Sequence, residues 1–395
     1  MFFNWVNGKC RITKIIAVAA FVCIISSSAF SASFKPGQIW RDTAGIAINA
    51  HGGGILYHQG SYYWYGQHMI EGELGNKAMV GVHCYASKNL SDWKDEGIVL
   101  PVSDDTKSDI VEGCILERPK VIYNELTKKF VMWFHLELKD TEYNSARSGV
   151  AISDNPTGPF KYMYSCRPNS GVWPLNASTE QKRVPDPSEA SKAGSSIWRL
   201  WVMLQNILGR DFQSGQQARD MTLFVDDDGK AYHIYSSEEN STIHIALLSD
   251  DYLSHAGPYA RAFPNRWMEA AAIFKHKGKY YFLASGCSGW APNQARAGVA
   301  ENIFGPWLEI DCPCLGVNPQ NGMGPEKTYG AQSTYIFKVE GQKHAYIAMF
   351  DIWKPKNAID GRYVWLPISI NSKRPYFSIE WRDEWELKWF DEPAN

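Results

Sequence analysis

The chain has 395 residues, of which 45% are hydrophobic and 21% charged, so it can bury the core of one large domain or two ordinary ones. Its formal net charge is −2 and it has no basic tract, which argues against nucleic acid as a partner. The 16 tryptophans and 20 tyrosines, in a chain with little helical periodicity, favour β-strands.

The first predicted element is a secretory signal peptide at residues 1–31. Three basic residues precede an apolar run at 15–25, and small polar residues follow, with a plausible cleavage site after Ser31. A membrane anchor is the alternative, but the apolar run is shorter than the roughly 20 residues that a spanning helix needs. We therefore expect a secreted or periplasmic protein with no membrane span after signal removal. Loss of the three basic residues takes the formal charge from −2 to −5.

A fivefold repeat fills residues 32–395. Each unit has an apolar strand, a turn containing glycine or lysine, and a second strand dense in aromatic residues, which is the pattern of a β-hairpin. A third strand follows each hairpin and runs into a tryptophan or Gly-Pro turn. The hairpins are expected at residues 54–65, 120–134, 221–235, 272–284 and 334–348.

Five units of about four strands predict an all-β fold, a five-bladed β-propeller. A β-sandwich would also account for the strands, but not for their fivefold recurrence. Residues 168–206, between the second and third units, are rich in proline, serine and charge and show little periodicity. We expect them to form an inserted loop over the top face of the propeller.

Six cysteines remain after the signal, and their spacing reveals no disulfide pairs. Cys312-Pro-Cys314 is not a zinc spacing, and no matching pair of cysteine or histidine residues completes one. Asp226-Asp-Asp-Gly229 stops too soon for a calcium loop and is expected to be a turn. We therefore expect neither a metal nor a cofactor.

Polar residues precede the first strand of every unit. Because the innermost strand of a propeller blade lines the central channel, these side chains are expected to converge on one site: His51, Glu117, Asp220, Glu269 and Gln332. Glycoside hydrolysis needs one group that protonates the leaving oxygen and another that activates water or attacks. Glu117 and Glu269 are the candidates, because burial among carboxylates would hold a proton on one of them at neutral pH. A single glutamate here can equally cap a strand, but recurrence at one repeat position favours catalysis.

At these residues the sequence resembles glycoside hydrolase family 43, and the resemblance covers nearly all of the chain after the signal. It implies a five-bladed propeller enzyme that inverts anomeric configuration, closest in pattern to the branch of exo-β-1,3-galactanases and related arabinofuranosidases and galactofuranosidases. The motifs that carry it are Asn49-Ala-His-Gly-Gly-Gly-Ile-Leu, Glu117-Arg-Pro-Lys-Val, Arg219-Asp-Met-Thr-Leu-Phe-Val-Asp-Asp-Asp-Gly, Gly289-Trp-Ala-Pro-Asn, Gln332-Ser-Thr-Tyr and Arg362-Tyr-Val-Trp-Leu-Pro.

The resemblance also implies roles for the site residues. Glu269 matches the general acid, and Glu117 matches a residue that orients the site or tunes the pKa of the acid. Gln332 matches a glutamine proposed to hold the attacking water in its imidic tautomer, a role that amide chemistry alone would not suggest. Asp220 corresponds to the aspartate that modulates the pKa. His51 stands where most of the family has an aspartate base, a loss that the galactanase-like branch shares.

Two departures weaken the transfer of substrate identity. Gln67 stands where the branch usually has glutamate, which affects a sugar contact, and Ala271 stands where proline is usual. Trp290 and Trp64 are expected either to stack on sugar or to belong to the blade core, and the sequence leaves both alternatives open.

The favoured function is an exo-acting hydrolase that releases galactose from β-1,3-galactan or arabinogalactan-type polysaccharide. We expect its substrate site to be a pocket. Two alternatives stay open: an α-L-arabinofuranosidase or β-D-galactofuranosidase that trims side chains, and a non-catalytic propeller that only binds glycan.

Overall fold

The computed structural model describes residue 1, residues 33–183 and residues 206–391. Residues 2–32, which include nearly all of the predicted signal peptide, lie outside the described residues, as do residues 184–205 of the predicted inserted loop. All the described strands belong to the second of the chain's two units, residues 32–395.

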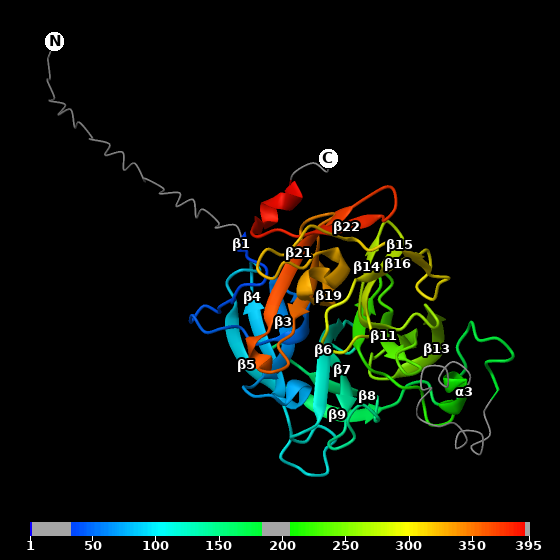
Figure 1. The fold of residues 1–395 in the computed structure, drawn as a ribbon. Helices are drawn as coiled ribbons and strands as arrows, with labels where there is room; N and C mark the ends of the chain where they lie inside the picture. The colour runs from blue at the N-terminus through cyan, green and yellow to red at the C-terminus, as the bar shows by residue number, and fades with distance from the viewer. Residues whose placement is uncertain (2–32, 184–205, 392–395) are drawn as a thin grey trace. The chain divides into compact units, whose positions relative to one another are not determined.

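Five antiparallel sheets follow one another along the second unit (Figure 1). The first four have four strands each, in chain order. The first two sheets are β2 (His51–His58), β3 (Ser61–Met69), β4 (Met79–Ser87) and β5 (Lys94–Pro101), then β6 (Ile115–Asn124), β7 (Lys129–Glu137), β8 (Arg147–Ser153) and β9 (Lys161–Cys166). The next two are β10 (Met221–Val225), β11 (Ala231–Ser237), β12 (Thr242–Leu248) and β13 (His255–Ala262), then β14 (Met268–His276), β15 (Lys279–Gly286), β16 (Arg296–Ala300) and β17 (Leu308–Ile310).

The fifth sheet and the chain ends complete the strands. The fifth sheet has β19 (Gln332–Lys338), β20 (Tyr346–Ile352), β21 (Arg362–Ile370) and β22 (Phe377–Glu380), with β18 (Cys314–Leu315) parallel to β22. A separate pair joins β1 (Ser33–Phe34) to β23 (Trp385–Glu386). The described helical segments are short: η1 (Gly75–Lys77), α3 (Ile207–Arg210), η3 (Pro325–Gly330), η4 (Ala358–Asp360) and η5 (Leu387–Asp391).

The first strands of the five sheets form a closed ring. β2 contacts β6, β6 contacts β10, β10 contacts β14, β14 contacts β19, and β19 contacts β2. This radial order confirms the predicted five-bladed β-propeller. Each of the five predicted hairpins falls on the first two strands of a blade, because apolar strands around a short turn pair with each other more readily than with distant strands.

The hydrophobic core of the propeller consists of five clusters, and each cluster joins two neighbouring blades. Blades one and two, two and three, three and four, and four and five share one cluster each. The remaining cluster joins blade five back to blade one. Among the described strands, none pairs the fifth sheet with the first, so side-chain packing closes the ring.

Trp64 lies in the cluster that closes the ring. Its side chain is 0% exposed, and its ring centroid lies 4.6 Å from that of Tyr363 and 4.7 Å from that of Trp365. Phe34, from β1, stacks on Trp385 at 4.4 Å in the same cluster. Trp64 therefore has no face available to a sugar, and the core alternative holds for this residue.

Two further observations concern the cysteines and the helices. All six cysteines among the described residues are free thiols. Within the described ranges, the structure contains no helix long and apolar enough to span a membrane.

Replacement of Trp64 by alanine should destabilise the propeller by about 3–5 kcal/mol, because it empties the centre of the cluster between blades one and five. Equilibrium denaturation in guanidinium chloride, followed by tryptophan fluorescence, measures the loss. Trp64→Phe is the matched control and should lose less. An unchanged midpoint for the alanine variant would contradict the closure role of this cluster.

Candidate active site

A cavity of about 840 Å³ opens at one end of the propeller, which is within the usual range for small-molecule sites of about 300–1,000 Å³. Its floor comes from the starts of first strands. Its walls come from the same connection in all five blades, the loop between the second and third strands. These loops supply Glu73, Leu74, Asn76, Lys77, Glu142, Tyr143, Asn240, Trp290, Trp353 and Lys356.

Three of the five first strands have an irregularity in their pairing next to a residue of the predicted site. The ladder between first and second strands is interrupted just after His51, Glu117 and Glu269. In each case the next residue has a positive φ: Gly52 at 62°, Arg118 at 52° and Ala270 at 61°. A β-bulge of this kind bends the strand and changes the direction of its side chains, and it is common beside active sites. At Arg118 and Ala270 this conformation is more strained than at Gly52, because both carry a side chain.

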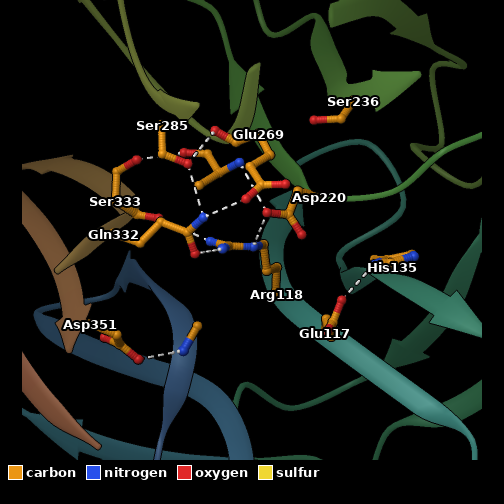
Figure 2. Close-up of polar contacts among 12 residues, drawn as sticks. Glu117, Arg118, His135, Asp220, Ser236, Glu269, Ser285, Gln332, Ser333 and Asp351 are labelled. Carbon is orange, nitrogen blue, oxygen red and sulfur yellow. Dashed lines mark hydrogen bonds and ion pairs between the residues drawn. The ribbon is translucent and has the colours of Figure 1, made fainter. Parts of the chain in front are cut away.

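Arg118 connects three blades across the floor of the cavity (Figure 2). Its Nε lies 2.9 Å from Asp220 Oδ2 in the third blade. In the fifth blade its Nη2 donates to Gln332 Oε1 at 2.6 Å, and its Nη1 donates to the Ser333 carbonyl at 2.9 Å. Because the guanidinium is buried and its charge is matched by the partly buried Asp220 carboxylate, it fixes the positions of both partners.

The Gln332 amide is fully hydrogen-bonded. Its Oε1 accepts from Arg118 and, at 2.8 Å, from Trp353 Nε1. Its Nε2 donates to Glu269 Oε1 at 3.1 Å and to Ser285 Oγ at 2.9 Å. Arg118 and the indole can only donate, so they identify the oxygen of the amide. The imidic tautomer expected from the sequence does not fit these partners, because its O–H would face two donors.

Glu269 is set up as an acid. Burial of its carboxyl and the neighbouring Asp220 carboxylate raise its pKa to about 8, against the opposing effect of the Arg118 charge. Gln332 Nε2 donates to Oε1, so that oxygen is an acceptor and the proton belongs on Oε2. Asp220 is itself fixed by Arg118 and by the Ala270 N–H, which donates to its Oδ2 at 3.0 Å. At neutral pH the site therefore combines a protonated carboxyl with a fixed negative charge.

Glu117 faces the same cavity from the second blade. Its Oε2 lies 2.8 Å from His135 Nδ1, and its Oε1 accepts from the Tyr143 hydroxyl at 2.8 Å. The structure thus brings four of the five expected residues together: Glu117, Asp220, Glu269 and Gln332 all line the cavity.

His51 is the exception. It is 1% exposed and does not line the cavity, so the expected sugar contact is not formed. Its ring stacks on Tyr363 at 5.1 Å, and its Nδ1 lies 3.4 Å from Asp351 Oδ2. Gly361 approaches the imidazole so closely that a side chain there would collide with it, and this space holds the His51 ring among the strands, away from the cavity. Gln67, its partner across the ladder, does line the cavity.

Comparison with known proteins identifies the chain. Glycosyl hydrolases family 43 matches residues 197–357. A solved GH43 β-1,3-galactosidase with galactodeoxynojirimycin is 47% identical over 90% of this chain and 100% of that chain, with a TM-score of 0.82. This chain belongs to glycoside hydrolase family 43.

Two further solved structures resemble this family 43 glycosidase. A second GH43 β-1,3-galactosidase is 37% identical over 91% of this chain and 65% of that chain, with a TM-score of 0.73. An exo-β-1,3-galactanase from Clostridium thermocellum is 31% identical over 89% of this chain and 66% of that chain, with a TM-score of 0.70. No curated protein sequence matches the chain.

Several residues of the family 43 site were not singled out as site residues from the sequence. Arg118 lies inside the Glu117-Arg-Pro-Lys-Val motif, which could have identified it as a partner of the carboxylates. His135 and Ser285 lie near the ends of second strands and Trp353 directly follows one, where the repeat pattern places aromatic and apolar core residues as well. Trp290 is 43% exposed at the cavity wall, edge-on to Trp353, so its face is available to a sugar.

One group of side chains in the described part of the glycosidase has the composition of a cation site. Single ligand atoms of Glu117, His135 and Asp220 lie within 4.8 Å of one another. Both ring nitrogens of His135 are already hydrogen-bonded, and the Arg118 charge is bound to Asp220. A cation would have to displace one of these bonds, so we assign no metal to the group.

Replacement of Asp220 by asparagine should lower the pKa of Glu269, because it removes the neighbouring negative charge. The alkaline limb of the pH profile of kcat/KM should move down by about one pH unit. Asp226→Asn, in the β10–β11 turn, removes a carboxylate away from the cavity and is the matched control. An alkaline limb that stays in place would show that Asp220 does not set this pKa.

Proposed function

We propose that this glycosidase is an exo-acting enzyme that releases galactose from β-1,3-galactan or arabinogalactan-type polysaccharide with inversion. The observation that carries the proposal is the Glu269 carboxyl, kept protonated beside Asp220 and hydrogen-bonded to Gln332 on the floor of a walled cavity. The substrates named for the three similar structures, all β-1,3-galactosidases or exo-β-1,3-galactanases, support galactose as the sugar.

The proposed reaction assigns one task to each side of the sugar. Glu269 donates its proton to the glycosidic oxygen as the bond to the anomeric carbon breaks. Asp220 and Glu117 are negative charges that raise the pKa of Glu269 and so retain this proton at neutral pH. Water attacks the opposite face of the sugar. For Gln332 to orient that water, the amide must exchange one of its four protein hydrogen bonds for the water.

The five loops support an exo mode of action. Each blade contributes one loop to the wall, so the cavity is surrounded on all sides and best accepts a chain end. A polymeric substrate of this kind is consistent with action outside the cell, and we propose a secreted or periplasmic location.

Purified protein should release galactose from a β-1,3-galactan backbone. Glu269→Gln should reduce hydrolysis by about 10²- to 10⁴-fold and preserve binding, because the amide lacks the transferable proton. Anion-exchange chromatography of the products and calorimetric binding to the oligosaccharide measure the two effects.

Three other outcomes would change the proposal. Release of arabinose or galactofuranose only from decorated arabinogalactan would move the enzyme to side-chain trimming. Binding without turnover by the wild type would favour the glycan-binding propeller. Undiminished hydrolysis by Glu269→Gln would remove Glu269 as the acid.

Trp290→Ala should raise KM for galacto-oligosaccharides about fivefold with a smaller change in kcat, because a stacking face is worth about 1 kcal/mol of binding. Steady-state kinetics with β-1,3-galactobiose and galactotriose measure the effect. Trp290→Phe keeps an aromatic face and should recover most of the affinity. Equal KM values for the alanine variant and the wild type would exclude a sugar contact.

A further inference from the structure

His135 lies behind Glu117 and does not titrate as an isolated histidine would. It is 0% exposed and faces Glu117 directly across the β6–β7 ladder. Its Nδ1 lies 2.8 Å from Glu117 Oε2, and its Nε2 lies 2.9 Å from Glu137 Oε1. Glu137 is also 0% exposed and does not line the cavity. One imidazole is therefore held between two carboxylates, one in the site and one behind it.

The hydrogen bonds limit where the protons can be. Glu137 Oε2 accepts from the Ala146 N–H at 2.8 Å, so this oxygen carries no proton. Asn76 Nδ2 donates to the Tyr143 oxygen at 2.6 Å, so the Tyr143 hydroxyl donates onward to Glu117 Oε1. Two protons are still needed for the two bonds of His135. A neutral imidazole supplies only one and would need a carboxyl proton on Glu117 Oε2 or Glu137 Oε1 for the other, whereas an imidazolium supplies both and leaves the two carboxylates ionised.

We propose that His135 is a positioning residue, an imidazolium anchored by Glu137 that keeps Glu117 ionised and directed into the cavity. The proposal rests on the proposed function, in which Glu117 is a fixed negative charge beside the acid Glu269. Glu137, which touches no substrate, is the remote counter-charge that makes the imidazolium possible.

The surrounding charges agree with this assignment. Asp220, at the start of β10, offers a carboxylate oxygen within 4.8 Å of the His135 and Glu117 ligand atoms. Arg118 and Glu269, from β6 and β14, and Tyr143, from the β7–β8 loop, are the other titratable groups that face Glu117. Arg219 reaches the Tyr143 carbonyl from the third blade.

The balance of these groups favours the charged ring. Burial alone would lower the pKa of His135, but its hydrogen bonds to Glu117 and Glu137 outweigh burial and raise the pKa to about 9. Because this value is above the ordinary histidine pKa of about 6.5, the stabilisation is complete below pH 6.5 and is lost as the pH rises through 9.

Glu137→Gln tests the proposal with little change of shape. The glutamine can keep its oxygen on the Ala146 N–H and present its NH₂ to His135 Nε2. A neutral His135 then still donates from Nδ1 to Glu117, so every hydrogen bond survives and only the charges disappear. Without the adjacent positive charge, Glu117 should ionise less readily.

In the proposed reaction an ionised Glu117 also stabilises the positive charge that develops on the sugar ring in the transition state, so protonation of Glu117 slows hydrolysis. The acidic limb of the pH profile of kcat/KM should therefore move up by about one pH unit in Glu137→Gln, a loss of about tenfold on that limb. Asp95→Asn is the matched control. It removes the carboxylate of the His83–Asp95 pair, whose bond is 2.6 Å and whose residues do not line the cavity. The control should leave the acidic limb in place. An unmoved limb in Glu137→Gln, with the same melting temperature as the control, would overturn the proposal.

Nitrogen NMR of the wild-type protein provides a readout that needs no substrate. Both ring nitrogens of His135, assigned by their absence from His135→Gln, should show the imidazolium shift at pH 7 and become inequivalent near pH 9. In Glu137→Gln they should be inequivalent at pH 7. A neutral His135 in the wild type at pH 7 would overturn the proposal even if Glu137→Gln failed to fold. Failure of the wild-type protein to hydrolyse β-1,3-galactan would contradict the proposed substrate but would leave this test of His135 unaffected.

Discussion

The site depends on one buried guanidinium. Arg118 is held by its own strand in a left-handed conformation and binds Asp220 in the third blade and Gln332 and Ser333 in the fifth. A buried positive charge is tolerable only when it is matched, and Asp220 is the carboxylate that matches it. The same contact places a negative charge next to Glu269, which is why an acid with a raised pKa can exist within a few ångströms of a cation.

The electrostatics of the cavity follow from this pairing. Arg118 offsets Asp220, and the proposed imidazolium of His135 lies between Glu117 and Glu137, so these two carboxylates share one positive charge. Glu269 avoids adding a further negative charge by keeping its proton. Because the surrounding charges oppose its ionisation, the Glu269 carboxyl is still protonated at neutral pH. In the proposed reaction it can therefore give this proton to the glycosidic oxygen.

Much of the architecture could be predicted from the sequence, because each blade is a local structure. A hairpin and its alternating apolar residues lie within a short stretch of sequence, so the five repeat units could be recognised from these local patterns. The repeat also placed Glu117, Asp220, Glu269 and Gln332 at one end of the channel. The direction of a side chain was not readable, because it depends on the residues that surround it in the folded chain. His51 is followed by the same kind of bulge as Glu117 and Glu269, yet it is held among the strands by Tyr363 and Asp351 of the fifth blade.

Other residues escaped prediction for a different reason. The sequence left both Trp64 and Trp290 open between core and sugar contact, and only the packing of blade five on blade one identifies Trp64 as the core residue, while Trp290 is exposed. His135 lies inside an apolar strand, where a buried histidine has no sequence signal. Its proposed role depends on its contacts with Glu117 and Glu137, and the contact with Glu117 forms only when β6 pairs with β7.

The cavity walls also bear on how such an enzyme can diversify. Each wall loop connects the second and third strands of its blade, and these strands take part in the clusters between blades. A loop can therefore lengthen, shorten or change its side chains while both of its ends stay fixed. The propeller thus offers five loops that can change almost independently of one another around the proposed acid. Selection, or an engineer, can alter which carbohydrate fits the cavity without changing the strand starts that form its floor.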